Sequence, residues 1–487
     1  MDIDVNCNAI FQGDKDEIQR AEKIIQVRNF LQPKKYSEMT KTCLHFKRLR
    51  GYIDHHLTEV ERDFPIAFSL LIYTDIEQSE RLLRANYRPQ NFYCIHVDSK
   101  TDEAIYVGMS SIASCFDNVF MTSKRFNVRW GTMTVLEPEL LCMQELWNKS
   151  IEWKYFINLT GQEFPLKTNY ELVRILQAYN GSNDIEGTFK RASTDRWQRA
   201  GAPPHNITAI KGSVHIVANR GFVDFILHDQ RAHDLLNWTR QTEVPDETFF
   251  STLNHNPHLG VPGAYLGVPE SDDAIKPFLA RFKHWVWGQR ECHGKHVRNI
   301  CVIGIGDLPD LAQSKKLFVN KFHQNFHPFG YDCLEELIAN RTRDTYLAVT
   351  RCGSFHRSRG VAVSTGHEVW QFLPVTRSGC FYRSRGVAVS TGHEVWQFSP
   401  VTRCGSFYWS RGVEVSTGQE VWQFPPVTRC GSFHRSRGVE VSTGHKVWQF
   451  PPVTMCGSFY RSRDIKTPVI CVEDAKIKKD GTEVAVV

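Results

Sequence analysis

The spacing of apolar residues between positions 64 and 180 changes repeatedly from short continuous runs to a helical period. The runs and the periodic stretches predict strands at 65–73, 91–98, 118–123 and 154–160 and helices at 80–87, 103–113, 134–147 and 170–179. In the third of these helices, one face carries Leu136, Leu140, Met143 and Trp147. Strands that alternate with helices predict an α/β fold with a mostly parallel sheet that is covered on both faces.

The loops after the first two predicted strands are the first candidates for a binding site. Parallel sheets bind ligands beyond the carboxyl ends of their strands. The chain leaves the first strand at Tyr73 and the second at Asp98, so we expect a site around these two residues.

The C-terminal part of the chain is a tandem repeat. From Arg351 a unit of 26 residues recurs, with equally spaced tryptophans at Trp370, Trp396, Trp422 and Trp448. A true repeat fold would stack these units so that each buries the apolar face of its neighbour. The copies are nearly identical even at polar stretches such as SRG and STG, which favours a recent duplication of coding DNA. We therefore predict poorly ordered repeats over 346–464 and a tail over 465–487, neither of which contributes to catalysis or to core stability.

Composition and charge exclude several classes of protein. The chain is 41% hydrophobic and 23% charged, which is typical of a globular protein. Its 59 basic and 53 acidic residues are scattered, so no nucleic-acid partner is expected. No apolar run is long enough to span a bilayer, and the start MDIDVNCNAI lacks the pattern of a signal peptide.

The cysteines favour an oxidising, lumenal compartment, whereas the first residues show no signal for targeting to one. Eight of the fourteen precede residue 345, without a repeated CxxC pattern, which favours disulfides over zinc, with buried free thiols as the alternative. Glycosylation triplets that fit a lumenal glycoprotein begin at Asn148, Asn158, Asn180, Asn206, Asn237 and Asn340. Since a lumenal protein needs a targeting segment, we expect that the N-terminus is incomplete.

Two local motifs carry candidate chemistry. In VPDETFF (244–250), Pro245 marks a helix start with Asp246 and Glu247 in its first turn, where a carboxylate is favoured whatever its function. In HVRNICVIGIGDL (296–308), a basic residue precedes a strand-like run and glycines, but the full GxGxxG pattern is absent. By themselves, Arg298 and Lys321 fit solvated surface charges as well as a functional site.

Several longer motifs resemble a known family. QNFYCIHVDSK (90–100), INLTGQEFPLKTN (157–169), VPDETFFSTLN (244–254) and RNICVIGIGDL with LFVNKF (298–322) are similar to the core 2 and I-branching β-1,6-N-acetylglucosaminyltransferases of glycosyltransferase family 14. The similarity extends to about Cys333. It implies a GT-A type catalytic domain over 63–345, a stem-like segment over 1–62, and an inverting transfer that requires no divalent metal.

The resemblance also implies how the donor phosphates are held. Most GT-A enzymes bind them through a metal on an Asp-x-Asp motif, but the triplet Asp2-Ile3-Asp4 lies at the terminus, outside the predicted sheet. Arg298 and Lys321 match the two basic residues that take the place of the metal. Glu247 matches the general base that removes the proton from the attacking 6-hydroxyl, with Asp246 as a capping or orienting neighbour.

The remaining implied contacts fall into two groups. The UDP-GlcNAc-binding positions are Leu71, Ile72, Tyr73, Asp98, Ser99, Lys100, Trp130, Arg298 and Lys321. The acceptor-binding positions are Glu186, Arg196, Trp285 and Trp287. Ser193 stands where the family has a basic acceptor contact, which leaves the acceptor open among core 2, core 4 and I-type glycans.

The implied disulfide pairs are Cys7–Cys333, Cys43–Cys115, Cys94–Cys142 and Cys292–Cys301, and the last would clamp the strand that carries Arg298. The implied setting is the Golgi lumen, with a membrane anchor that this chain lacks. The implied reaction transfers N-acetylglucosamine from UDP-GlcNAc to the 6-hydroxyl of a galactose or N-acetylgalactosamine on a glycoprotein or glycolipid. The alternative is a non-catalytic, lectin-like relative that kept the fold.

Overall fold

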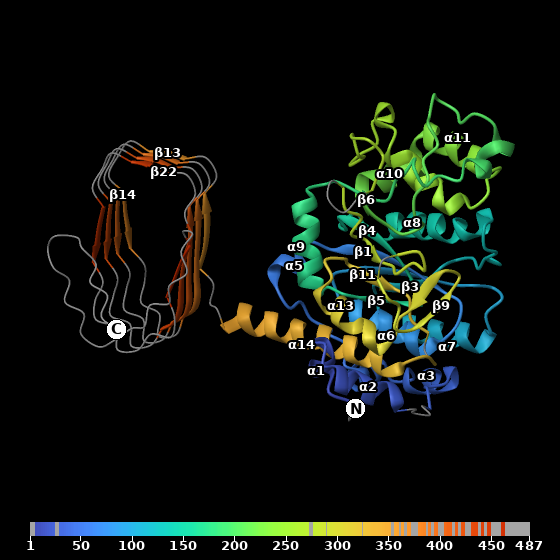
Figure 1. Cartoon of the computed structure of the whole chain (residues 1–487), viewed down its shortest axis with the longest axis horizontal. Coiled ribbons are helices and arrows are strands. Elements are labelled where there is room, and N and C mark those ends of the chain that lie inside the picture. Colours follow the sequence, from blue (N-terminus) through green and yellow to red (C-terminus); the bar gives the residue numbers. More distant parts are fainter. Residues whose placement is uncertain are drawn as a thin grey trace. The chain divides into compact units, whose positions relative to one another are not determined.

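A computed structural model describes residues 5–24, 29–271, 276–288, 290–323 and 325–351, and beyond them the strands from Phe355 to Ser462. The chain forms two compact units, residues 1–343 and 344–487 (Figure 1). No helix in the described part of the chain has the length and hydrophobicity that crossing a membrane would require.

A six-stranded sheet forms the centre of the first unit. Its strands, in spatial order, are β3 (Val119–Met121), β2 (Phe92–Val97), β1 (Ile66–Ile72), β4 (Tyr155–Thr160), β7 (Ile216–Asn219) and β6 (Asp184–Ile185). The first four are parallel, whereas β7 runs antiparallel to both β4 and β6. The predicted strands are therefore confirmed, and so is the mostly parallel sheet.

Helices cover both faces of this sheet. They are α6 (Ile76–Asn86), α7 (Glu103–Ala113), α8 (Glu137–Lys149), α9 (Asn169–Tyr179), α10 (Arg220–His228), α11 (Gln230–Thr239) and α12 (Phe249–Asn254). In Figure 1, α8 and α10 lie on one side of the sheet and α6 and α7 on the other. The predicted helix at 134–147 begins instead as a 3-10 turn at Met133–Val135, because Pro138 occupies the first turn of α8.

Alternate residues of β1 face two separate cores. Phe68, Leu70 and Ile72 pack with side chains of α6, α7 and α9. Ala67 packs with side chains of α8, α10 and α11 on the opposite face. Both faces are buried, which explains why this strand reads as a continuous apolar run.

The N-terminal residues belong to the same compact unit as the central sheet. They form α1 (Cys7–Phe11), α2 (Lys15–Lys23), α3 (Pro33–Met39), α4 (Cys43–Arg50) and α5 (Glu59–Arg62). Tyr36 and Phe46 are fully buried in the core beneath α6 and α7. Ile10 is fully buried in a third core, which also contains residues of the C-terminal helix.

Smaller elements complete the unit beside the central sheet. They are the sheet of β5 (Glu163–Pro165), β11 (Phe318–Asn320) and β8 (Arg281–Phe282), the hairpin of β9 (Lys295–Val297) and β10 (Ile300–Val302), and the helices α13 (Leu308–Gln313) and α14 (Pro328–Arg351). The structure contains the four disulfides that the resemblance implies, namely Cys7–Cys333, Cys43–Cys115, Cys94–Cys142 and Cys292–Cys301.

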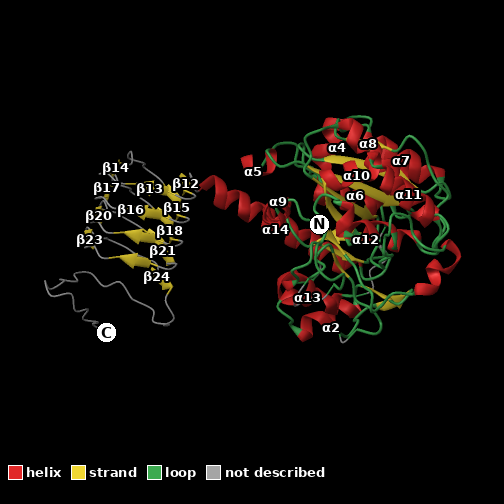
Figure 2. Cartoon of the chain, turned by 90° about the horizontal axis from the view of Figure 1, so that it is seen from above, coloured by secondary structure: helices red, strands yellow, loops and turns green. Residues whose placement is uncertain are grey.

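In the second unit, the structure describes strands that repeat with the 26-residue unit. They pair in parallel with the equivalent strands of the next copy, in three sheets that contain β12 (Phe355–Arg359) to β24 (Phe459–Ser462) (Figure 2). The register places Trp370 opposite Trp396, Trp396 opposite Trp422, and Trp422 opposite Trp448. This is the stacking that defines a true repeat fold. The predicted tail, 465–487, lies outside the described residues.

Candidate active site

The carboxyl ends of β1 and β2 form one edge of the candidate site. The amide of Asp98 donates to the carbonyl of Ile72 (2.9 Å), and the amide of Gly161, after β4, donates to the carbonyl of Leu71 (2.9 Å). The Tyr73 side chain beyond β1 is 60% exposed. The predicted donor contacts at the ends of the first two strands therefore lie next to one another.

Lys100 and Asp98 form an ion pair at this edge. Lys100 Nζ lies 3.0 Å from Asp98 Oδ2 and 5.6 Å from the centroid of the Tyr73 ring. The amide of Ser99 donates to the carbonyl of Phe126 (2.9 Å), which orders the loop. Asp98 neutralises the charge of Lys100. This edge can therefore provide a ligand with hydrogen bonds and with the face of the Tyr73 ring, but with little net positive charge.

Trp130 stands on a loop that is tied to the predicted catalytic turn. Its side chain is 71% exposed. The amide of Val244 donates to the carbonyl of the next residue, Gly131 (3.1 Å). Gly131 has φ +76, a conformation that favours glycine. The donor-side loop and the turn that carries Glu247 are thus held together through the backbone.

Arg298 occupies a turn and not the strand that the sequence predicts. Together with Asn299 it forms the two-residue connection between β9 and β10, and both residues have positive φ (53° and 62°). Two positive φ values are the signature of the hairpin turn that matches strand twist. The Cys292–Cys301 disulfide clamps β10, the strand that follows the turn. Arg298 is exposed, and no carboxylate of the described residues pairs with it.

Lys321 lies beside Arg298 and is buried. Its Nζ donates to the carbonyl of Val297 (3.0 Å), and only 7% of the residue is exposed. Burial lowers the pKa of Lys321, and the neighbouring Arg298 charge lowers it further. Burial, Lys321 and Lys295 also lower the pKa of His323. Cations that lie this close repel one another, so the group is suited to an anionic ligand that relieves the repulsion.

Glu247 is held between two cations. It closes the 3-10 turn Pro245–Glu247, which precedes α12, and its side chain is 28% exposed. Oε2 lies 2.6 Å from Arg196 Nη1 and 3.5 Å from Lys211 Nζ. The carboxylate is therefore paired and partly open to solvent, as a general base must be.

The neighbouring Asp246, for which a capping or an orienting role was expected, does not cap the helical turn that contains it. It is 7% exposed, and its Oδ1 has no hydrogen-bond partner among the described residues. Burial, and then the charge of Glu247, raise the pKa of Asp246 to about 7. The two adjacent carboxyl groups therefore lie in different environments, and burial favours the neutral form of Asp246.

The predicted acceptor contacts surround the same region. The rings of Trp285 and Trp287 stack with centroids 5.2 Å apart, and Trp287 is 69% exposed. The amide of Val286 donates to the carbonyl of Asn299 (2.9 Å), so this aromatic segment lies against the Arg298 turn. Glu186 follows β6, and its Oε1 lies 3.4 Å from Nη2 of Arg191. Arg196 instead binds Glu247, as described above.

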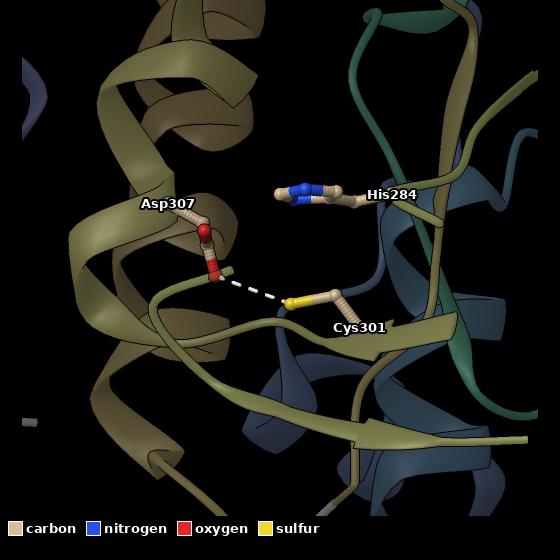
Figure 3. Close-up of side chains that lie close together, drawn as sticks. All are labelled: His284, Cys301 and Asp307. Atoms are coloured by element: carbon tan, nitrogen blue, oxygen red, sulfur yellow. Dashed lines mark hydrogen bonds between the residues drawn. The ribbon is translucent and has the colours of Figure 1, made fainter. Parts of the chain in front are cut away.

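One cluster among the described residues has the spacing of a metal site. Figure 3 shows its members, His284, Cys301 and Asp307, side by side. The Cys301 sulfur is bonded to Cys292, so it is no thiolate. Asp307 accepts hydrogen bonds from the amides of His293 (3.0 Å) and Gly304 (2.8 Å). These engaged groups brace the loop and do not form an open ligand set.

The chain contains two Asp-x-Asp triplets. Asp2 and Asp4 lie outside the described residues. A second triplet, Asp14-Lys15-Asp16, was overlooked in the sequence. The Asp14 carboxylate caps α2 by accepting from the amides of Asp16 and Glu17. Its place at a helix N-terminus explains its composition without a metal.

Sequence reasoning missed two lysines near Glu247. Lys211 contacts Glu247 directly, and Lys283 Nζ donates to Ser213 Oγ (3.0 Å). Burial lowers the pKa of Lys283, while the charges of Glu186 and Glu247 act in the opposite direction. Both lysines stand in irregular segments, where no periodic signal points to them.

Comparisons with known proteins agree with this geometry. Residues 66–312 match the protein family described as Core-2/I-Branching enzyme. The chain is 35% identical to a β-1,3-galactosyl-O-glycosyl-glycoprotein β-1,6-N-acetylglucosaminyltransferase of Homo sapiens, over 70% of this chain and 86% of that protein. It is 34% identical to the human protein of the same name numbered 3, and 33% identical to one of bovine herpesvirus 4. These two alignments each cover 69% of this chain and 82% of the relative.

Proposed function

This chain belongs to the Core-2/I-branching enzyme family, and we propose that it transfers N-acetylglucosamine from UDP-GlcNAc to the 6-hydroxyl of a galactose or N-acetylgalactosamine in a glycan. The observation that carries the proposal is the pair Arg298 and Lys321. No described carboxylate pairs with either side chain, and the Arg298 turn lies against the segment that carries Trp285 and the exposed Trp287. Two fixed cations without a counter-anion suit a diphosphate.

The proposed reaction uses residues on both sides of the site. The acceptor O6 attacks C1 of N-acetylglucosamine, and its proton passes to the Glu247 carboxylate. The bond between C1 and the diphosphate oxygen breaks, and its electron pair leaves with UDP. Arg298 and Lys321 stabilise the negative charge on this leaving group, in the place of a metal ion. Attack on the face opposite the leaving group inverts the anomeric centre.

The acceptor and the compartment follow from the same reasoning. The stacked Trp285 and Trp287 present ring faces of the kind on which a pyranose packs. We propose glycoprotein or glycolipid glycans as acceptors, with no preference among core 2, core 4 and I-type. Four disulfides require an oxidising compartment, which supports the Golgi lumen as the proposed setting.

The test replaces the proposed base. Glu247→Gln should lower transfer turnover by roughly 10²- to 10⁴-fold while UDP-GlcNAc still binds. Glu243→Gln, which removes an exposed carboxylate four residues earlier, is the matched control and should be fully active. Full activity of Glu247→Gln would exclude Glu247 as the base. A wild-type chain that binds glycans but releases no UDP would instead support the lectin-like alternative.

A further inference from the structure

Glu247 has more cationic partners than a single general base needs. Arg196 comes from the 3-10 segment Thr194–Ala200 and Lys211 from the loop before β7, and both approach the same oxygen. Lys283 approaches from the segment after β8 and interacts with Glu247 at longer range. The opposing charges come from Asp246 on its own turn and from Glu186, which interacts with Lys283.

The backbone around Lys211 is fixed from two directions. Its carbonyl accepts from the amide of Thr188 (2.8 Å), and the amide of Gly212 donates to the carbonyl of Glu247 (2.7 Å). A Cβ on Gly212 would lie 2.3 Å from the Glu186 carbonyl and 2.5 Å from Ser251 Cβ. Lys211 is therefore anchored between the segment of Glu186 and the turn of Glu247, and there is no room for a side chain at the next position.

We propose that Lys211 is a positioning residue that keeps the Glu247 carboxylate oriented and ionised when Arg196 engages the acceptor. The inference rests on the proposed function and on the resemblance, which makes Arg196 an acceptor contact, whereas the structure pairs Arg196 with Glu247. In the structure Arg196 makes the direct 2.6 Å contact, while Lys211 stands at 3.5 Å as the second cation. When hydroxyl groups of the acceptor bind the Arg196 guanidinium, Lys211 remains as the positive charge beside Glu247.

The kinetic test compares Lys211→Met with Lys211→Arg and with Lys41→Met, which removes an exposed lysine after α3. Loss of a nearby cation disfavours the ionised carboxylate. Lys211→Met should lower kcat roughly three- to tenfold and move the acid limb of the pH profile upward by about half a unit to one unit. KM for UDP-GlcNAc and the thermal midpoint should not change. Lys211→Arg should restore most of the activity, and Lys41→Met should match the wild type.

Two kinetic outcomes would overturn the proposal. A raised KM for the acceptor with unchanged kcat and pH profile would make Lys211 an acceptor ligand. An equal loss of activity in Lys211→Met and Lys211→Arg, with a lowered thermal midpoint, would make it a purely structural residue.

A second measurement separates this inference from the proposed function. The ¹³C signal of the Glu247 side-chain carboxyl, followed through a pH titration of the full chain, does not depend on turnover. Its titration should shift to higher pH in Lys211→Met and stay in place in Lys41→Met. An inactive wild type with this shift would refute the transferase but retain the coupling of Lys211 to Glu247. An unchanged titration in Lys211→Met would refute the coupling even in an active enzyme.

Discussion

Replacing Asp246 by asparagine should stabilise the protein at high pH much more than at low pH. The pKa of Asp246 is about 7 in the folded protein, against an ordinary value of 3.8. Because the folded value is the higher one, the contribution of this group to stability is complete below pH 3.8. It is lost as the pH rises towards 7. Asparagine has nearly the same shape and does not ionise.

The magnitude follows from the two pKa values. A shift of one unit corresponds to about 1.4 kcal/mol, so the full shift corresponds to about 4 kcal/mol above pH 7. At pH 5 only about 2 kcal/mol of this is lost, because this pH is little more than one unit above the pKa at which the unfolded carboxyl ionises. The stabilisation by Asp246→Asn should therefore be roughly 2 to 3 kcal/mol larger at pH 8 than at pH 5.

The assay is urea unfolding of the full chain with its disulfides intact, followed by near-UV circular dichroism at both pH values. Any cost of placing the amide group in the buried site is similar at both pH values and cancels in the difference. Asp195→Asn, at an exposed position on the neighbouring 3-10 segment, is the control and should show no such difference. An equal effect of Asp246→Asn at pH 5 and pH 8 would refute the raised pKa.

Three further predictions concern UDP binding by Arg298, the effect of metal removal and the repeats. Arg298→Ala should weaken UDP binding, measured by calorimetry, at least about tenfold. The thermal midpoint should not change, because Arg298 is an exposed turn residue and its replacement removes only a ligand contact. Arg290→Ala, at another exposed arginine, is the control, and an equal affinity of Arg298→Ala and the wild type for UDP would contradict the assignment. Turnover should also survive EDTA, and strict dependence on manganese would show that these cations do not replace a metal. Truncation after Thr345 should preserve the thermal midpoint and donor turnover, since the described core residues of α14 end at Ile338; a large drop in either would show that the repeats matter to the domain.

The central sheet could be predicted from the sequence because strands that are buried on both faces are continuous apolar runs. β1 and β4 are apolar at almost every position, and α7 begins and ends where its pattern predicts. From the sequence, no helices were predicted over residues 1–62, where the structure has α1 to α5. Tyr36 and Phe46 are buried by residues far away along the chain, and such contacts have no local period.

The residues of the candidate site could be predicted from the sequence, but their arrangement in space could not. Family resemblance supplied Glu247, Arg298 and Lys321, and the structure places the last two side by side. The turn at Arg298 contains no glycine, so Asn299 was the one sequence signal for its positive φ values. Burial of Asp246 and the contact of Lys211 with Glu247 arise only when the loop before β7 meets the turn before α12.

The disulfide between Cys7 and Cys333 has a mechanical consequence. It joins positions 326 residues apart, one near each end of the unit formed by residues 1–343. Tension applied to the two ends of this unit would run through one covalent bond and bypass the helices and sheets between them. The disulfide therefore shields the helices and sheets from a pulling force. They would carry that force only after this disulfide is reduced.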